Sequence, residues 1–124
     1  MVKNKNNEIV IILSDQSQSR GLFTALKAYA DQVTVFNNPI TAMEYLKNNH
    51  CRIILTEKNF NLMDGNGFIQ QLLKNQYTDN LIILEEEQEV VQKPEDSARI
   101  MILSKPVDLN DLLDQINKIY KEEL

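Results

Sequence analysis

The chain of 124 residues contains one cysteine, Cys51, and one histidine, His50. A single thiol cannot form an intrachain disulfide, so a disulfide-stabilised secreted fold is excluded and a reducing, cytosolic setting is expected. Cys51 stands at the start of an apolar segment, where we expect it to be a small buried side chain. Because no second histidine lies nearby, we expect His50 to be a solvated loop residue.

Long apolar runs and clustered positive charges are also missing. The apolar segment Ile9–Leu13 is far too short for a signal-peptide core or a membrane span, so the protein is expected to be cytoplasmic and away from membranes. The chain has 18 acidic and 13 basic residues, a formal net charge of −5, with no stripe of lysine or arginine. This charge repels a phosphate backbone, and nucleic acid is therefore not an expected partner.

Short apolar segments predict the strands. Four of them are apolar throughout, as is typical of parallel strands covered on both faces: Ile9–Leu13, Ile53–Leu55, Leu81–Leu84 and Ile100–Leu103. A fifth segment, Val33–Phe36, alternates apolar residues with Thr34 and suits an edge strand. The length fits one domain over 1–124, with residues 1–7 as a frayed lead-in.

Between most of these strands lie segments whose apolar residues recur at helical spacing. The expected helices include Leu22 to Ala30, a helix opened by the N-cap Asn38 and Pro39, Phe68 to Leu73, and a last helix that runs from the N-cap Asp108 to Tyr120. This alternation predicts an α/β domain with a central parallel sheet and helices on both faces.

In such sheets a functional site lies beyond the carboxyl ends of the strands. The polar residues that follow the expected strands are Ser14 and Asp15, Glu57, Glu85, and Ser104 to Pro106. These positions are therefore the candidates for a functional site.

The segments around these positions resemble the receiver domain of a two-component response regulator over nearly the whole chain. The motifs that resemble it are IVIILSD (9–15), RIILTEKNFNLMDG (52–65), NLIILEE (80–86) and MILSKPVDLNDLL (101–113). The resemblance implies a flavodoxin-like, doubly wound fold of five βα units, with five parallel strands in the order 2-1-3-4-5.

The resemblance also implies a chemistry. In that family a partner kinase gives a phosphoryl group to an aspartate at the end of the third strand, beside a divalent cation. By position, Asp15, Glu57 and the carbonyl of Asn59 would hold Mg²⁺. Lys105 would hold the phosphate, and the peptide bond before Pro106 would be cis.

Several positions depart from this pattern together. The acceptor position is Glu57, whose carboxylate extends about 1.5 Å further than that of an aspartate, and misplacement by about 1 Å costs about 100-fold in a positioned reaction. Ser14 replaces the usual acidic neighbour of Asp15. At the two switch positions, Glu85 replaces a hydroxyl residue and Ile102 replaces an aromatic one. These changes indicate a pseudo-receiver in which the usual acceptor is not phosphorylated.

The charges of the expected site do not balance. Asp15, Glu57 and Glu85 around Lys105 leave an excess of two negative charges, and two like charges about 4 Å apart cost about 4 kcal/mol at an intermediate dielectric. A Glu57–Lys105 ion pair that mimics part of the charged state is the favoured relief. A protonated acid or a bound Mg²⁺ or Ca²⁺ would also relieve the repulsion. Ser14 is in addition a candidate N-cap of the first helix.

The helix between the fourth and fifth strands is expected to be short or irregular, because Pro94 interrupts the segment 85–98. In the family this region contributes to the surface that partners recognise.

The sequence therefore predicts a non-enzymatic receiver-like module. We expect it to need no cofactor and to bind a histidine kinase, a scaffold or another signalling protein, with a homodimer left open. The alternative is a working receiver that uses Mg²⁺ and an unconventional acceptor, Ser14 or Asp64. A flavin- or nucleotide-binding enzyme is disfavoured because the glycine fingerprint of a phosphate loop is absent. Whether the chain acts alone or belongs to a longer protein stays open.

Overall fold

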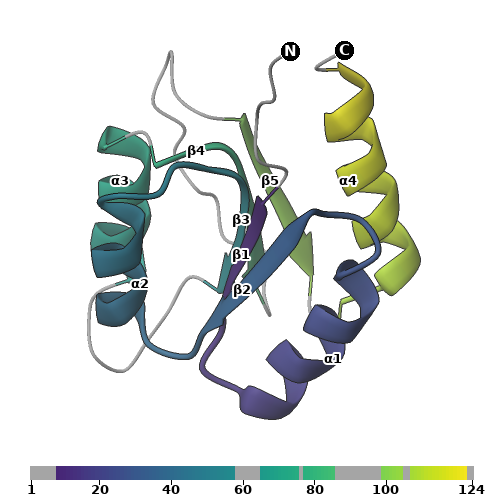
Figure 1. Cartoon of the computed structure of the whole chain (residues 1–124), viewed down its shortest axis with the longest axis horizontal. Helices are drawn as coiled ribbons and strands as arrows, with labels where there is room; N and C mark the ends of the chain where they lie inside the picture. The colour runs from purple at the N-terminus through teal and green to yellow at the C-terminus, as the bar shows by residue number, and fades with distance from the viewer. Residues whose placement is uncertain (1–7, 58–64, 76, 86–98, 105–106, 123–124) are drawn as a thin grey trace.

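The computed structural model describes residues 8–57, 65–75, 77–85, 99–104 and 107–122 (Figure 1). The elements in chain order are β1 (Glu8–Ile12), α1 (Gln16–Leu26), β2 (Gln32–Phe36), α2 (Pro39–Leu46), β3 (Cys51–Glu57), α3 (Gly65–Lys74), β4 (Thr78–Glu85), β5 (Arg99–Ser104) and α4 (Leu109–Glu122).

The five strands form one parallel sheet in the order β2-β1-β3-β4-β5. This confirms the flavodoxin-like, doubly wound fold. The register keeps the carboxyl ends of the central strands level, since Ile12 pairs with Thr56 and Glu57 pairs with Leu84. The predicted short helix between the fourth and fifth strands falls on residues 86–98, which lie outside the described residues.

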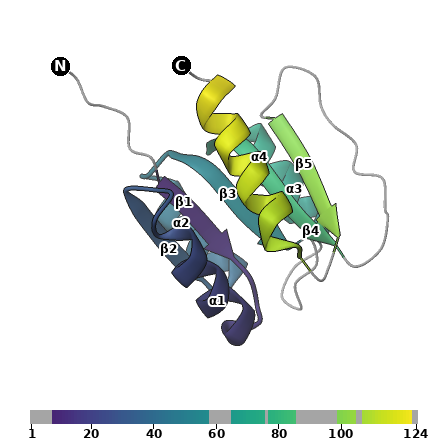
Figure 2. The same cartoon turned by 90° about the vertical axis from the view of Figure 1, so that its right-hand side faces the viewer.

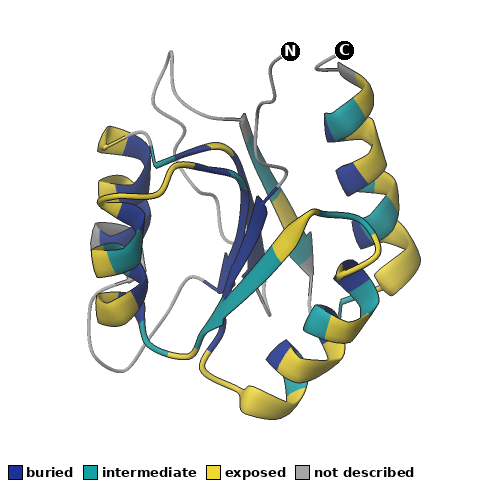
Figure 3. Cartoon of the chain, in the orientation of Figure 1, coloured by how far each residue is buried: buried dark blue, intermediate teal, exposed yellow. Residues whose placement is uncertain are grey.

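Helices cover both faces of the sheet (Figures 1 and 2). Alternate residues of β1 point to opposite faces, so that Ile9 and Ile11 join the core under α1 and α4, whereas Val10 and Ile12 join the core under α2 and α3. Figure 3 shows the central strands buried and the outer surfaces of the helices exposed. Burial on both faces explains why β1 is apolar from Ile9 to Ile12, after its first residue, Glu8.

The two outer strands differ from the central ones. β2 lies at one edge, as predicted, and the side chains of Val33 to Phe36 are half-buried. β5 lies at the other edge, and Ile102 is 43% exposed. The expectation that Ile100–Leu103 is covered on both faces is therefore wrong, because an edge strand has fewer neighbours to cover it.

The predicted caps fix two of the helix starts. The Asn38 carboxamide oxygen accepts from the backbone N–H of Ile40 at 2.7 Å, and Pro39 is the first residue of α2. Asp108 Oδ1 accepts from the N–H of Asn110 at 2.9 Å and so caps α4. Both side chains satisfy N–H groups that the first helical turn leaves unpaired.

Within the described ranges, no helix has both the length and the apolar character needed to cross a bilayer.

Candidate functional site

The carboxyl ends of the neighbouring strands β1, β3 and β4 lie side by side at one end of the sheet. Ser14 follows β1, Glu57 is the last residue of β3, and Glu85 is the last residue of β4. The fold therefore brings together three of the segments that the sequence marked as a site. The side chain of Glu85 lies outside what the structure describes.

A hydrogen bond joins Ser14 to Glu57. Ser14 Oγ donates to Glu57 Oε2 over 2.7 Å, between residues 43 positions apart in the chain. Glu57 is only 7% exposed, whereas Ser14 is exposed. A short hydrogen bond from a hydroxyl to a buried carboxylate is charge-assisted and among the stronger polar contacts in proteins. The carboxylate that the sequence analysis predicted at the acceptor position is thus engaged by Ser14.

The backbone beneath this contact is also fixed by a side chain. Thr56 is fully buried, and its Oγ lies 3.1 Å from the carbonyl oxygen of Ile12 and 2.8 Å from that of Glu57. Because Thr56 links the end of β1 to the end of β3, it holds in register the two strands that present Ser14 and Glu57.

Asp15 caps the first helix, and its predicted role as a metal ligand stays a prediction. Its Oδ1 accepts from the N–H of Gln18 at 3.0 Å, and its backbone is extended, with φ −82° and ψ 112°, so Asp15 is the N-cap of α1. The expectation that Ser14 caps α1 is wrong. Asp15 directly precedes the first helical residue, where its carboxylate reaches the free N–H groups, and the Ser14 hydroxyl is directed to Glu57 instead.

Among the residues that the structure describes, no group of three or more His, Cys, Asp or Glu side chains could hold a metal ion. Asn59, the third member of the predicted magnesium set, lies outside them. So do Lys105, Pro106 and Asp64, and the Glu57–Lys105 ion pair and the cis peptide bond therefore remain predictions.

One residue beside the site was missed by sequence reasoning. Asn37, just after β2, donates from Nδ2 to the carbonyl oxygen of Leu13 at 2.8 Å and to Ser19 Oγ at 3.2 Å. Leu13 is the residue before Ser14, so Asn37 ties α1 and the end of β2 to the backbone of the site. Asparagine after an apolar strand is common in turns, and the sequence alone offers no stronger signal.

A second polar cluster, also missed, lies at the opposite end of the sheet. The Glu8 carboxylate is 2% exposed, and its Oε2 accepts from Tyr45 Oη at 2.5 Å, Thr34 Oγ1 at 2.8 Å and Gln32 Nε2 at 3.2 Å. The pKa of Tyr45 is raised above its ordinary value, mainly by burial and next by the hydrogen bond to Glu8. These contacts fasten α2 to the sheet far from Glu57.

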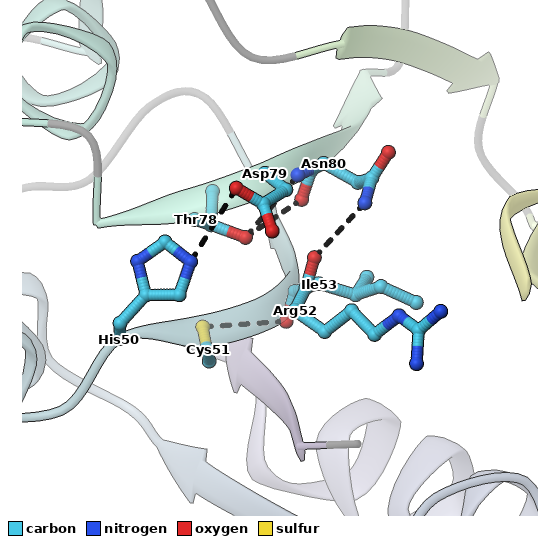
Figure 4. Close-up of polar contacts among 7 residues, drawn as sticks. All are labelled: His50, Cys51, Arg52, Ile53, Thr78, Asp79 and Asn80. Atoms are coloured by element: carbon cyan, nitrogen blue, oxygen red, sulfur yellow. Dashed lines mark hydrogen bonds and ion pairs between the residues drawn. The ribbon is translucent and has the colours of Figure 1, made fainter. Parts of the chain in front are cut away.

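The amino ends of β3 and β4 are polar but structural (Figure 4). Cys51 is fully buried, as predicted, and burial raises its pKa to about 12. His50 is exposed, as predicted, and its Nε2 lies 3.4 Å from Asp79 Oδ1. Asn80 Nδ2 donates to the carbonyl oxygen of Arg52 at 3.1 Å. Because β3 runs from Cys51 to Glu57, these contacts lie at the opposite end of the strands from the candidate site.

The structure is similar to solved receiver domains. The receiver domain of the Francisella response regulator 1452 has a TM-score of 0.78 at 20% identity, covering 96% of this chain and 100% of its own. A signal receiver domain of an HD domain-containing protein from Pseudomonas fluorescens has a TM-score of 0.79 at 19% identity, with coverages of 98% and 92%. The chemotaxis protein CheY4 of Vibrio cholerae has a TM-score of 0.73 at 17% identity, with coverages of 93% and 99%.

These likenesses define the class of fold: the chain has the fold of receiver domains. No protein-family model matches the sequence, and no curated protein matches it. At such identities the similarity concerns the fold, and function has to be argued from the site.

Proposed function

We propose that this protein is an atypical receiver domain of two-component signalling that acts by binding a protein partner and is not phosphorylated on Glu57. The observation that supports this most is the 2.7 Å hydrogen bond from Ser14 Oγ to the buried Glu57 carboxylate. The fold supports the same class, since the structures it resembles include receiver domains from Francisella and Pseudomonas.

Phosphoryl transfer to a carboxylate needs a free oxygen in line with the donor and a cation to neutralise the developing charge. Here one oxygen of Glu57 is already bonded to Ser14. The neighbouring acid, Asp15, uses an oxygen to cap α1. The hydroxyl stabilises the Glu57 charge without a metal ion, and the longer side chain displaces the carboxylate by about 1.5 Å from where an aspartate would hold it. Each difference weakens the transfer reaction.

The proposed module has no catalytic turnover and requires no cofactor. Its partner is a protein of the same signalling system, such as a histidine kinase or a scaffold, and its place is the cytoplasm. A Glu57–Lys105 ion pair would give the site part of the charge pattern of a phosphorylated receiver. One carboxylate lacks the three oxygens of a phosphoryl group, so this mimicry is partial.

A second function is favoured by the same contact. A hydroxyl that donates to a buried carboxylate has a base beside it, which is the usual arrangement for activating serine. Ser14 Oγ would attack the phosphorus of a donor, the bond to the leaving group would break, and Glu57 would take the hydroxyl proton. The chain would then be a receiver with Ser14 as acceptor.

One experiment separates these functions. The purified protein is incubated with phosphoramidate and Mg²⁺ and its intact mass is measured, beside the variants Ser14→Ala and Glu57→Gln. We expect no mass gain in any of the three proteins. A gain of one phosphoryl group that disappears in Ser14→Ala would assign Ser14 as acceptor. A gain that survives in Ser14→Ala and disappears in Glu57→Gln would overturn the proposal.

A further inference from the structure

A pocket of about 350 Å³ lies between α1 and the end of β2. Its lining consists of three polar uncharged side chains, one arginine and two apolar side chains: Gln16, Ser19, Asn37, Arg20, Phe23 and Val35. The volume is at the lower end of the range of ligand pockets, and it suits one or two side chains of a partner. We call it the α1–β2 pocket.

The floor of the pocket is fixed by hydrogen bonds. Ser19 is 2% exposed, and its Oγ donates to the carbonyl oxygen of Gln16 at 3.1 Å and accepts from Asn37 Nδ2 at 3.2 Å. Asn37 also donates to Leu13. These polar groups have their partners within the protein, so the floor is preformed rather than adaptable.

The rim offers donors that the protein itself leaves unused. Within the described part of the chain, the guanidinium of Arg20 makes no hydrogen bond or ion pair, and the same holds for the carboxamide of Gln16. Both residues are exposed. Phe23 and Val35, both half-buried, supply apolar wall beside these donors.

The local charge is positive on a protein whose net charge is −5. Arg20 is on the rim, and Lys27 Nζ lies 5.6 Å from the centre of the Phe23 ring. The first turn of α1 contains no acidic residue, so the partial positive charge of its N–H groups is offset only by the N-cap Asp15, whose Oδ1 is taken by Gln18. A guanidinium beside an apolar wall suits a carboxylate that is accompanied by an apolar group.

We propose that the α1–β2 pocket is a docking site for a partner protein segment that places a glutamate or aspartate carboxylate on Arg20 and an adjacent apolar side chain against Phe23 and Val35. The inference rests on the proposed function as a docking module and names the chemistry of its partner. It does not involve phosphoryl transfer. The mass experiment can therefore overturn the proposed function while the docking site stands, and the docking test can fail while Glu57 stays unphosphorylated.

The pocket is also linked to the candidate site. Asn37 lines the pocket and donates to the carbonyl oxygen of Leu13, whose neighbour Ser14 donates to Glu57. An occupant that shifts Asn37 therefore changes the surroundings of the Ser14 backbone amide. This provides a readout outside the pocket itself.

The test is a titration followed by the amide signals of the ¹⁵N-labelled full chain in NMR. The probe is a blocked peptide of alternating leucine and glutamate, and the control peptide has glutamine in place of glutamate. We expect saturable shifts at Arg20, Phe23, Asn37 and Ser14 with the acidic peptide, and a dissociation constant that rises with salt because the contact is ionic.

Matched variants locate the charge. We expect Arg20→Gln to weaken binding at least fivefold and Lys118→Gln, an exposed lysine on α4, to leave it unchanged. Equal binding of the glutamine peptide, or undiminished binding to Arg20→Gln, would overturn the proposal. Saturation of the same signals by sodium acetate at equal concentration would overturn the protein partner and assign a site for a free carboxylate.

Discussion

Replacing Ser14 by alanine removes the donor of the Ser14–Glu57 hydrogen bond and leaves the Glu57 carboxylate in place at 7% exposure. A hydrogen bond to a charged group contributes about 1.5–3 kcal/mol, and the loss of a donor to a buried acceptor costs a similar amount. For a chain of this length about 1 kcal/mol corresponds to about 4 °C in melting temperature. We therefore expect the melting temperature of Ser14→Ala to fall by about 6–12 °C.

The matched control is Ser17→Ala, a serine of the same helix start that is exposed and whose side chain makes no hydrogen bond with other described residues. A surface change of this kind stays within about 0.5 kcal/mol. Urea unfolding followed by circular dichroism gives the free energies of both variants. If Ser14→Ala and Ser17→Ala are equally stable within that margin, the Ser14–Glu57 hydrogen bond does not stabilise the protein.

Three further predictions concern stability. Tyr45→Phe removes a donor to the buried Glu8 carboxylate and is expected to cost about 1.5–3 kcal/mol in urea unfolding, and a cost below about 0.5 kcal/mol would contradict it. Burial raises the pKa of Cys51 from its ordinary 9.0 to about 12, so the folded state keeps a proton that the unfolded chain loses; this stabilisation is present below pH 9 and is lost toward pH 12. Relative to Cys51→Ala, the free energy of unfolding should fall by up to about 1.4 kcal/mol per pH unit in that window, and parallel pH profiles would exclude it. Ile116→Ala, at a fully buried position of α4, should lower the free energy of unfolding by about 2–5 kcal/mol. Leu109 is 42% exposed on the same helix, and Leu109→Ala should lower it by less than about 1 kcal/mol. Equal losses in the two variants would contradict the burial of Ile116 against the sheet.

The strand order was implied by the resemblance to receiver domains, whereas the positions of β1 and β2 in the sheet follow from features that are local in sequence. Apolar throughout, the segment Ile9–Leu13 predicts a strand covered on both faces, and the alternation around Thr34 predicts an edge; the sheet places both accordingly. The start of β4 was predicted less well. β4 begins at Thr78 rather than Leu81, because the parallel ladder continues through the polar residues Thr78 to Asn80 alongside Cys51 and Ile53. Backbone pairing does not require apolar side chains.

The sequence predicted which residues the strand ends bring to the site. It did not predict which hydrogen bonds their side chains make. Parallel strands of a doubly wound sheet bring Ser14 and Glu57 to the same end of the sheet, where the strands have their carboxyl ends. Which of Ser14 and Asp15 caps α1 depends on where the backbone turns into the helix, and both residue types are good caps. The Glu8 and Asn37 contacts depend on how closely α2 and β2 approach β1 in the folded protein, which side-chain periodicity does not specify.

We propose that Glu57 is engaged by a hydrogen bond from Ser14 and does not take part in phosphoryl chemistry. A high-resolution crystal structure grown with Mg²⁺ and beryllofluoride, an analogue of a bound phosphoryl group, tests it directly. We expect Ser14 Oγ still within hydrogen-bond distance of Glu57 and no beryllofluoride on that carboxylate. Beryllofluoride bonded to Glu57, with Mg²⁺ beside it and Ser14 displaced, would show that Glu57 is a working acceptor.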